Sequence, residues 1–555
     1  MNAAILFEPD GYLLTGPKLM GRQAAGHGFL RAAVQAAAGG RLTAYTPIRQ
    51  SAEAFRRAVA EIDPRCETAW IPGSRLDLLA EAGVLYRPDQ ILGPVARQRL
   101  RAGPAAYSLC GVTHTLATAP TLDAIAKILV EPVMAWDALI CTSAAARAVV
   151  DAVLDHQADY LRWRTGQPVA AARPLLPIIP LGVHTSDFAF SGEDRAAARD
   201  LLGLAPDDIA VLFAGRLSVN GKAHPFAMFR ALQKTAEDTS EPVVLVIAGQ
   251  AASEPMARLF RSGLADICPA VRAVFVDGKD AGAYRQAWAG ADLFISLADS
   301  IQETFGLTPL EAMAAGLPAL VSDWNGYRDT VRDGVDGFRV RTWAPPPGAG
   351  EPIAAAYEAG ENGYEPYLAR ANTAVAVDMG ELTLRLRDLV TDPALRRRMG
   401  AAGRARAREV FDWSVVFRSY QALWDEQTAI RRKAAENPVT LVWQSRAPRT
   451  GSDHMGPFET FAAYPTGPIT PRTVVSRTDA TPEAYRELIR QEAVSLWTIA
   501  PELADRVLAA LAAGPLSLED LVAAADLAPL RAAEVVARLA KIDVLALAEP
   551  PGARA

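Results

Sequence analysis

The sequence predicts an α/β protein with two doubly wound, Rossmann-like domains that face a cleft, followed by a small, mainly helical C-terminal domain. Short apolar runs rich in Val, Ile and Leu alternate with longer Ala-rich stretches of helical character. This alternation is typical of βαβ units around a parallel sheet that is buried on both faces. It occurs twice along the chain, which indicates two sheets with a ligand-binding cleft between them.

Each half of the α/β region contains predicted strands, every one an apolar run that precedes a helical stretch. In the first half we expect strands at residues 3–7, 42–45, 67–71, 105–112 and 138–143. In the second half we expect them at residues 208–215, 242–249, 272–278, 291–297 and 318–323.

Pro and Gly interrupt PIIPLGVHTSDF at 177–188, so we interpret this segment as the crossing between the two domains. A stretch dense in Pro, Gly, Ser and Thr follows the second domain and reads as a linker or wrap. The predicted segments are a first domain at 1–183, a second domain at 184–410, a helix at 411–436 that closes the second domain, a linker or wrap at 437–481 and a last domain at 482–555.

Length and composition favour a globular, multidomain protein. The chain has 555 residues, of which 50% are hydrophobic and 22% charged, with a formal net charge of -6. A chain of this length exceeds one hydrophobic core. The net charge gives no general attraction to nucleic acid or anionic lipid. Residues 1–190 carry 18 Lys and Arg against 16 Asp and Glu, so the first domain is the one better suited to approach a membrane.

The predicted location is cytoplasmic. The four cysteines show no CxxC pattern, so neither a zinc site nor a disulfide framework is expected. The first residues, MNAAILFEPDGYLL, lack the basic and apolar segments of a signal peptide, and no run of about 18 apolar residues occurs. We expect a protein that is soluble or, at most, peripheral at the inner face of the membrane.

The last domain shows three compact helical patterns and then a strand-like run, VLALAE. This order is similar to a helix-turn-helix or winged-helix domain. Residues 501–555 contain five Lys and Arg but eight Asp and Glu, whereas a DNA-binding face is basic. We therefore expect protein docking or dimerisation through residues 482–555 and no nucleic-acid partner.

Two cations follow a predicted strand in GRLSVNGKAHP, at 215–225. Arg216 offers a planar fork for phosphate oxygens, and Lys222 offers a compact point charge. Together they suit a diphosphate at the mouth of the cleft. Taken alone, this segment is better explained by two solvated loop cations.

The segment ETFGLTPLE places two carboxylates, Glu303 and Glu311, around a predicted helix start. Thr308, Pro309 and Glu311 have the spacing of a capping box with Pro at the first helical position. The same helix start provides free N–H groups that hold an anion. Glu303 precedes the helix and belongs to no cap, so it is the more diagnostic carboxylate.

The spacing E-x7-E followed by AMAAGLPALVSD, with the tail GYRDTVRDGVDGFRV, resembles the donor-binding signature of family-4 retaining glycosyltransferases of the GT-B fold. Further matching segments are GRL with Lys222, IPLGV, WDALICTS and LRRRMGAAGRARAREVFDW. The resemblance covers about residues 1–435 and is most specific in the second domain.

The resemblance implies a role for several residues. Glu303, taken as catalytic, would hydrogen-bond hydroxyls of the donor sugar, and Glu311 would hold the ribose of the nucleotide. Arg216 and Lys222 would bind the diphosphate. Backbone donors of Gly306, Leu307 and Thr308 would add to this donor site. The family needs no metal, and the sequence contains no Asp-X-Asp, so the nucleotide diphosphate sugar is expected as a co-substrate without a metal or other cofactor.

In the first, acceptor-side domain, the resemblance points to the loop after the first strand and to a histidine. Gly16, Lys18 and Gly21 lie in LLTGPKLMGRQAAGHGFLRA, which resembles the glycine-bearing loop between donor and acceptor but departs from its usual GG-rich form. His114 follows a later strand, where related enzymes place a histidine near the reacting sugar. A lone histidine is equally well explained as a satisfied polar residue.

These observations predict a glycosyltransferase that moves a hexose-type sugar from a nucleotide diphosphate sugar to a glycan, lipid or peptide acceptor. Two alternatives stay open at this point. One is another GT-B enzyme, such as a sugar-nucleotide epimerase or a phosphorylase. The other is a non-catalytic scaffold whose C-terminal domain binds a protein partner.

Overall fold

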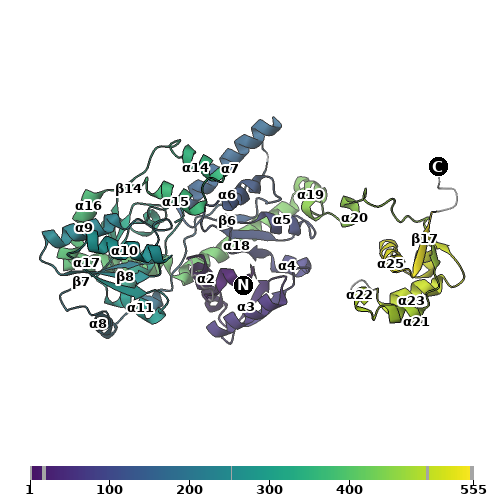
Figure 1. Ribbon diagram of the computed structural model, residues 1–555, viewed down its shortest axis with the longest axis horizontal. Helices are drawn as coiled ribbons and strands as arrows, with labels where there is room; N and C mark the ends of the chain where they lie inside the picture. The colour runs from purple at the N-terminus through teal and green to yellow at the C-terminus, as the bar shows by residue number, and fades with distance from the viewer. Residues whose placement is uncertain (1–2, 15–20, 170, 252, 496–498, 550–555) are drawn as a thin grey trace. The chain divides into compact units, whose positions relative to one another are not determined.

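The computed structural model describes residues 3–14, 21–169, 171–251, 253–495 and 499–549. The chain consists of two compact units, Met1–Gly451 and Ser452–Ala555 (Figure 1). The first unit contains both predicted α/β domains. The second contains the small C-terminal domain.

The first domain is built on a six-stranded parallel sheet of order β3-β2-β1-β4-β5-β6. This is the strand order of a doubly wound Rossmann-like sheet. The strands are β1 Ala4–Leu6, β2 Arg41–Tyr45, β3 Glu67–Ile71, β4 Val84–Tyr86, β5 Ser108–Val112 and β6 Ala138–Ile140. Its helices are α1 Pro9–Tyr12, α2 Gly21–Ala37, α3 Arg49–Ile62, α4 Leu76–Ala82, α5 Gly93–Arg99, α6 Ala119–Ala126, η1 Lys127–Leu129 and α7 Ala144–Thr165.

The second domain repeats this topology with the order β12-β11-β10-β7-β8-β9, again all parallel. Its strands are β7 Ile209–Ala214, β8 Val243–Gly249, β9 Arg272–Asp277, β10 Leu293–Ser296, β11 Ala319–Ser322 and β12 Gly337–Val340. A separate antiparallel pair joins β13 Thr342–Trp343 to β14 Ala376–Val377. The two sheets confirm the predicted α/β fold class with two Rossmann-like domains.

The helices of the second domain flank its sheet. They are η2 Thr185–Phe188, α8 Gly192–Leu201, α9 Phe226–Asp238, α10 Glu254–Ile267, α11 Ala281–Gly290, α12 Thr308–Ala315, α13 Tyr327–Thr330, α14 Glu351–Glu358, α15 Tyr364–Asn372, α16 Met379–Thr391, α17 Pro393–Arg406 and η3 Ala407–Phe411. Two more helices, α18 Trp413–Glu436 and α19 Pro438–Ser445, follow them.

Helix α18 differs from its expected place. We predicted that it closes the second domain, but its apolar side chains belong to the core of the first domain. Phe29 on α2 is the centre of this contact, with ring centroids 5.6 Å from Phe417 and 5.4 Å from Tyr420. Figure 1 shows α18 beside α2. The aromatic side chains of α18 pack against the aromatic side chains of the first-domain core. The chain thus returns to the domain in which it began.

The chain crosses twice between the α/β domains, and the two crossings are hydrogen-bonded to each other. The Val183 N–H donates to the Phe411 carbonyl oxygen at 2.8 Å, and the Trp413 N–H donates to the Val183 carbonyl oxygen at 3.1 Å. Trp413 packs so closely that a Cβ added at Gly182 would lie 2.5 Å from its ring. Glycine at this position therefore permits the crossing.

A buried ion pair stabilises the first domain. The Arg99 guanidinium and the Asp137 carboxylate are both fully buried, with N–O distances of 2.6 and 2.8 Å. Asp137 also accepts the backbone N–H groups of Leu109 and Met134. Because every carboxylate oxygen has more than one donor, the desolvation cost of this pair is offset by hydrogen bonds.

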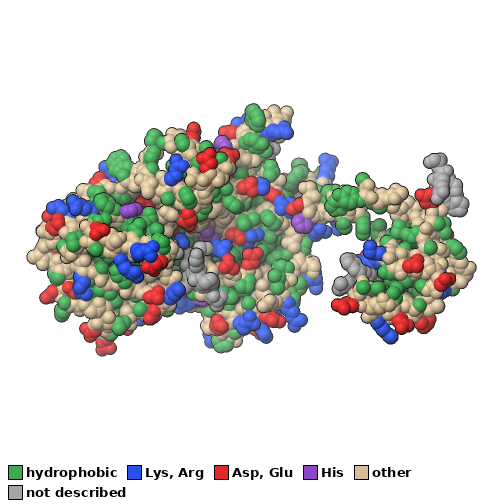
Figure 2. Space-filling model, in the orientation of Figure 1, with side chains coloured by type: hydrophobic (Ala, Val, Ile, Leu, Met, Phe, Trp, Pro, Cys, Tyr) green, Lys and Arg blue, Asp and Glu red, His purple; other side chains and the backbone are tan. Residues whose placement is uncertain are grey.

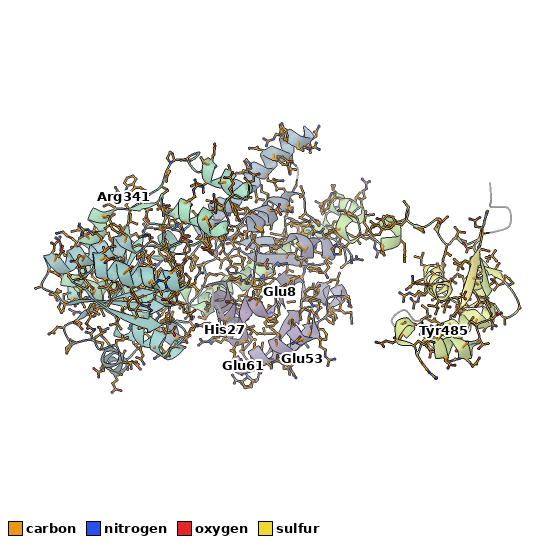
Figure 3. The ribbon with its side chains drawn as sticks, in the orientation of Figure 1. Glu8, His27, Glu53, Glu61, Arg341 and Tyr485 are labelled. Atoms are coloured by element: carbon orange, nitrogen blue, oxygen red, sulfur yellow. The ribbon has the colours of Figure 1, made fainter. Side chains whose placement is uncertain are left out.

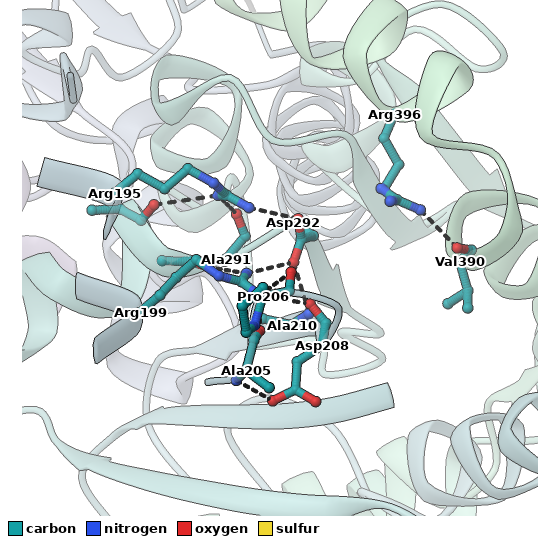
Figure 4. Close-up of polar contacts among 12 residues, drawn as sticks. Arg195, Arg199, Ala205, Pro206, Asp208, Ala210, Ala291, Asp292, Val390 and Arg396 are labelled. Atoms are coloured by element: carbon teal, nitrogen blue, oxygen red, sulfur yellow. Dashed lines mark hydrogen bonds and ion pairs between the residues drawn. The ribbon is translucent and has the colours of Figure 1, made fainter. Parts of the chain in front are cut away.

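A second polar cluster joins the central strands of the second sheet at their amino ends (Figure 4). Asp292, directly before β10, accepts hydrogen bonds from Arg195 at 2.6 Å, Arg199 at 3.1 Å and the Ala210 N–H of β7 at 2.8 Å. This carboxylate therefore links α8 to the two strands whose opposite ends carry the predicted donor residues.

The C-terminal unit combines a three-stranded antiparallel sheet, of order β16-β15-β17, with short helices. Its strands are β15 Val474–Arg477, β16 Leu516–Ser517 and β17 Leu545–Ala548, and its helices are η4 Ser452–His454, α20 Pro457–Thr460, α21 Pro482–Leu488, α22 Glu492–Ser495, α23 Pro501–Ala510, α24 Leu518–Ala524 and α25 Pro529–Lys541. Strand β15 lies within the predicted linker at 437–481. Because it pairs with β16 and β17, the folded unit begins before residue 482.

Tyr485, labelled in Figure 3, lies in the core of the C-terminal unit. Its hydroxyl donates to the Ile499 carbonyl oxygen at 2.6 Å and accepts from the Ile499 N–H at 2.9 Å. The unit thus has a hydrophobic core of its own and an internally satisfied buried hydroxyl.

Lys and Arg side chains are interspersed with Asp and Glu side chains on the face shown in Figure 2. Within the described ranges, no helix is long and apolar enough to cross a membrane.

Candidate functional site

The predicted donor residues lie at the carboxyl ends of β7 and β10, the central pair of the second sheet. These strands are neighbours although β8, β9 and their helices separate them in sequence. The strand order therefore reverses between them, and ligands of doubly wound sheets bind outside such a switch point. The loop after β7 carries Arg216 and Lys222, and the loop after β10 carries Glu303 and leads into α12.

Lys222 and Glu303 form an ion pair between these two loops. Both side chains are mostly buried, with 21% and 13% of their surfaces exposed. Burial alone would lower the pKa of Lys222, but the Glu303 carboxylate outweighs it and raises this pKa above its ordinary value. The ammonium group is therefore charged at neutral pH.

Arg216 supplies the second cation. Its positive charge acts on Lys222 and on Tyr364 of α15, which places the guanidinium at the same end of the sheet. Among the residues that the structure describes, Arg216 has no carboxylate partner. A half-buried, unpaired guanidinium next to a second cation is suited to bind a polyanion such as a diphosphate.

The start of α12 offers backbone donors to the same place. Among the described residues, the N–H groups of Gly306, Leu307 and Thr308 have no hydrogen-bond acceptor. Gly306 has φ +84°, and an added Cβ would lie 2.1 Å from the Tyr327 ring. Glycine is thus required both by the backbone angle and by the close approach of Tyr327. Free amides at a helix start form an anion site.

The capping box predicted for Thr308 and Glu311 is wrong. Leu307, with φ -75° and ψ -32°, is the residue before the helix, and no side chain caps the start of the helix. Leu307 already has helical angles, so Thr308 lies within the helix rather than before it. The Thr308 hydroxyl instead contacts the Tyr327 hydroxyl, which also hydrogen-bonds Ser296 at 2.9 Å.

Glu311 is free to act as a ligand because it is not a cap. Burial raises its pKa to about 7, opposed by the Lys222 charge and a hydrogen bond from Tyr284. Its Oε2 atom is buried and has no partner among the described residues. Buried carboxylate oxygens are normally hydrogen-bonded, so this oxygen is an unsatisfied acceptor. Tyr284 also lines a pocket of about 440 Å³ with Ser186, Asp187, Phe188, Arg285 and Trp288.

The structure describes only some of the candidate site residues of the first domain. His114 follows β5 and hydrogen-bonds the Pro88 carbonyl, and burial together with the nearby Arg22 charge lowers its pKa to about 4. It is therefore neutral at pH 7. Gly21 is the exposed first residue of α2. Gly16 and Lys18 lie outside the described residues. Within the described part of the chain, no hydrogen bond or ion pair joins His114 to the donor residues.

The loop that carries Glu303 also contacts the first domain. The Ser143 hydroxyl, at the start of α7, donates to the Thr304 carbonyl oxygen at 2.7 Å. The next backbone N–H, that of Ala144, donates to Asp329 of α13 at 2.6 Å. The residue adjacent to Glu303 is thus tied to the amino end of a first-domain helix.

Sequence reasoning missed several residues that support this site. Tyr284 holds Glu311, Tyr327 covers Gly306, and the Asn325 amide donates to the Glu303 carbonyl oxygen at 2.8 Å. Tyr327 lies in the quoted segment GYRDTV, directly after the sheet, which is a weak signal. Tyr284 stands on α11 with no motif around it.

Residues 194–344 match the family model described as Glycosyl transferases group 1. This range contains every predicted donor residue, from Arg216 to Glu311. Residues 194–344 are thus similar to a group 1 glycosyl transferase domain. The match confirms, for this domain, the glycosyltransferase resemblance that its motifs predict.

Similar proteins match this chain over part of their length. D-inositol 3-phosphate glycosyltransferase of Actinosynnema mirum is 35% identical over 196 residues, which are 34% of this chain and 43% of that relative. Alpha-maltose-1-phosphate synthase of Mycobacterium tuberculosis is 28% identical over 248 residues, which are 44% of this chain and 54% of that relative. The chain thus spans about half the length of these relatives.

Among solved structures, Anabaena HepE in complex with UDP aligns with 77% of this chain and all of its own, at 14% identity and a TM-score of 0.47.

Proposed function

We propose that this chain is a retaining glycosyltransferase that moves a hexose-type sugar from a nucleotide diphosphate sugar to an acceptor held on the first domain. One observation carries the proposal. Within a group 1 glycosyl transferase domain, two cations, three free backbone amides and two carboxylates converge at the switch point between β7 and β10. Cations and amides suit the diphosphate, and carboxylates suit the hydroxyls of sugar and ribose.

The roles follow from the environment of each group. Arg216, Lys222 and the amides of Gly306, Leu307 and Thr308 neutralise the negative charge that develops on the diphosphate as the sugar departs. Glu303, relieved of part of its ion pair with Lys222, accepts hydrogen bonds from the sugar. The unpartnered Oε2 of Glu311 accepts one from the ribose.

The leaving-group charge is met by protein cations and helix amides, so we propose that transfer needs no metal. Treatment with EDTA should then leave the rate unchanged. Retention of anomeric configuration is taken from the resemblance to family-4 enzymes. Proton NMR of the first-formed product tests it, and an inverted product would contradict it.

The experiment that tests the function measures transfer by R216A and K222A variants. Removal of one electrostatic donor costs about 100-fold to 1000-fold in rate, so each variant should lose at least about 100-fold in kcat/KM. K234A is the matched control, since Lys234 is a half-exposed lysine on α9. Near-normal turnover by both site variants would refute the assignment.

Another GT-B chemistry, epimerisation or phosphorolysis, uses the same donor groups. Product analysis distinguishes them, because an epimerase returns a nucleotide sugar and a phosphorylase releases a sugar phosphate. A non-catalytic scaffold is disfavoured by the unpaired Arg216 and the buried, unpartnered Glu311 oxygen, because a decayed site has no reason to keep such unsatisfied groups.

We further propose a cytoplasmic protein that attaches to the inner face of a membrane through α19. No side chain of this helix is buried. Val439, Val442 and Trp443, which share one helix face, are 78%, 53% and 55% exposed. Residues 431–450 hold five Lys and Arg against one Glu, in a chain of net charge -6. An apolar face between basic residues fits an anionic lipid surface.

Vesicle co-sedimentation tests this attachment. The protein should pellet with vesicles that contain phosphatidylglycerol and stay in solution with pure phosphatidylcholine, and V442S/W443S should lose the difference. L530S, which changes an 88% exposed leucine of the C-terminal unit, should retain it. Equal pelleting of wild type and V442S/W443S would contradict the role of α19.

A further inference from the structure

The structure places a buried carboxyl, Asp299, against the loop that carries Lys222, and no motif of the donor site includes it. Asp299 follows β10 and is only 7% exposed. It lies four residues before Glu303, at the same end of the sheet. Asp299 contacts backbone groups of the loop that carries Lys222, not the Lys222 side chain.

Asp299 holds the Lys222 loop at two points. Its backbone N–H donates to the Lys222 carbonyl oxygen at 3.2 Å. Its side chain accepts a hydrogen bond from the backbone N–H of His224. One residue thus binds the chain immediately before and immediately after Ala223.

Neighbouring contacts hold the earlier part of the same loop. The Ser300 hydroxyl donates to the Asn220 carbonyl oxygen at 2.9 Å, and the Asn372 amide donates to the same oxygen at 2.5 Å. The Gly221 N–H donates to the Ser218 hydroxyl at 3.0 Å. The loop 218–224 is therefore hydrogen-bonded along its length, and Asp299 contacts the backbone of Lys222 and His224.

The carboxyl of Asp299 is buried at a cost to stability. Its Oδ1 atom has no partner among the described residues, and burial raises its pKa to about 7. A polar group that is buried without full hydrogen bonding destabilises a protein. Such groups are found where a site needs them.

We propose that Asp299 is a positioning residue of the donor site, which fixes the loop 218–224 so that Lys222 reaches the diphosphate. This inference rests on the proposed function, since it assigns Asp299 to the same ligand. Asp299 acts through Lys222 and does not contact the substrate. Removal of its side chain frees the backbone at His224 and lets the Lys222 ammonium move away from the anion.

A double-mutant cycle on nucleotide binding tests the proposal. Binding of UDP, GDP and ADP to the full chain is measured by calorimetry, and the best ligand is carried through D299A, D299N, K222A and D299A/K222A. D299A should weaken binding about tenfold, because small misplacements of a binding group are costly. D299N keeps an oxygen acceptor for the His224 N–H and should restore binding to within about threefold.

The cycle separates positioning from a general loss of structure. If Asp299 acts through Lys222, then D299A/K222A binds no more weakly than K222A alone. D292A is the structural control, since Asp292 flanks the other end of β10; it should lower the thermal midpoint without changing affinity in the folded protein.

Three results would overturn the proposal. The first is wild-type affinity in D299A. The second is an equal loss of affinity on D299A substitution with and without Lys222. The third is a D299N variant that binds as weakly as D299A. A wild-type chain that binds none of the three nucleotides would instead overturn the proposed function, and this assignment with it.

Discussion

Single residues decide what the cleft of the second domain binds. Lys222 and Glu303 neutralise each other in the absence of ligand, whereas Arg216 and one oxygen of Glu311 have no partner among the described residues. We propose that a ligand with both a diphosphate and hydroxyl groups provides partners for Arg216 and for the Glu311 oxygen.

We expect Glu311 to make nucleotide affinity depend on pH. Its pKa of about 7 leaves the carboxyl mostly protonated at pH 6 and mostly ionised at pH 8. The ionised form is the better acceptor for a ribose hydroxyl. If only this form binds, affinity rises about tenfold between pH 6 and pH 8.

Calorimetric titrations at the two pH values check this expectation, with E311Q as the control. The variant keeps the shape of the side chain but does not ionise, so its affinity should lack that part of the rise. Asp299 and the nucleotide phosphates titrate equally in both proteins. Parallel pH curves for wild type and E311Q would show that Glu311 does not contact the nucleotide.

At the level of elements, the turn from β10 into α12 depends on Gly306. Alanine at φ +84° costs about 1–2 kcal/mol, and here its Cβ also meets the Tyr327 ring. G306A should therefore lower both the thermal midpoint and the nucleotide affinity.

Gly334 provides a matched comparison for Gly306. It has φ +71°, but a Cβ added there meets nothing within 4 Å. G334A should thus show the backbone cost alone and keep normal affinity. If G306A and G334A were equally stable and bound the nucleotide equally well, the contact with Tyr327 would not shape the site.

The first sheet depends on the buried pair of Arg99 and Asp137. D137A leaves the Arg99 guanidinium buried without its partner, which typically costs about 3–5 kcal/mol. Urea unfolding should show an early loss of the first domain. D77A removes an exposed partner of Arg75 and should leave the transition unchanged. Equal midpoints for D137A and D77A would mean that the buried pair contributes nothing.

The sequence predicts most elements of the two sheets but not all of them. Strands β4 and β12 were missed, because only Gly83 separates β4 from the apolar helix α4 and Arg339 interrupts the apolar run of β12. The domain against which α18 packs was also predicted wrongly. Its apolar stripe shows that it is buried, but only the fold shows that the aromatic partner is Phe29, far away in sequence.

The candidate site could likewise be predicted only in part from the sequence. Arg216, Lys222, Glu303 and Glu311 were named from local motifs, and the fold places them together at one end of the sheet. Tyr284 and Asp299 could not be named, because their importance comes from contacts across the fold. Tyr284 reaches Glu311 from another helix, and Asp299 holds a loop that follows a different strand.

For the whole molecule, the two units suggest a division of labour. The C-terminal unit has its own core, and the donor residues all lie in the first unit. We propose that the winged-helix-like C-terminal unit docks a protein partner, a peptide acceptor or a second copy of this chain.

A chain that ends at residue 451 tests this division. It should bind the nucleotide with unchanged affinity and hydrolyse the donor at the normal rate, because the donor site is complete without the C-terminal unit. Transfer to the acceptor should fall if the unit docks the acceptor. Loss of nucleotide binding in the folded, shortened chain would contradict the division.

The most direct test of the donor site is a calorimetric titration of the full chain with UDP, GDP and ADP, repeated with an R216A/K222A variant and with K234A. We predict that at least one of the three binds to wild type and to K234A, and that R216A/K222A binds it at least about 100-fold more weakly. Binding of none of them, or equal binding by R216A/K222A, would contradict a nucleotide diphosphate site between β7 and β10.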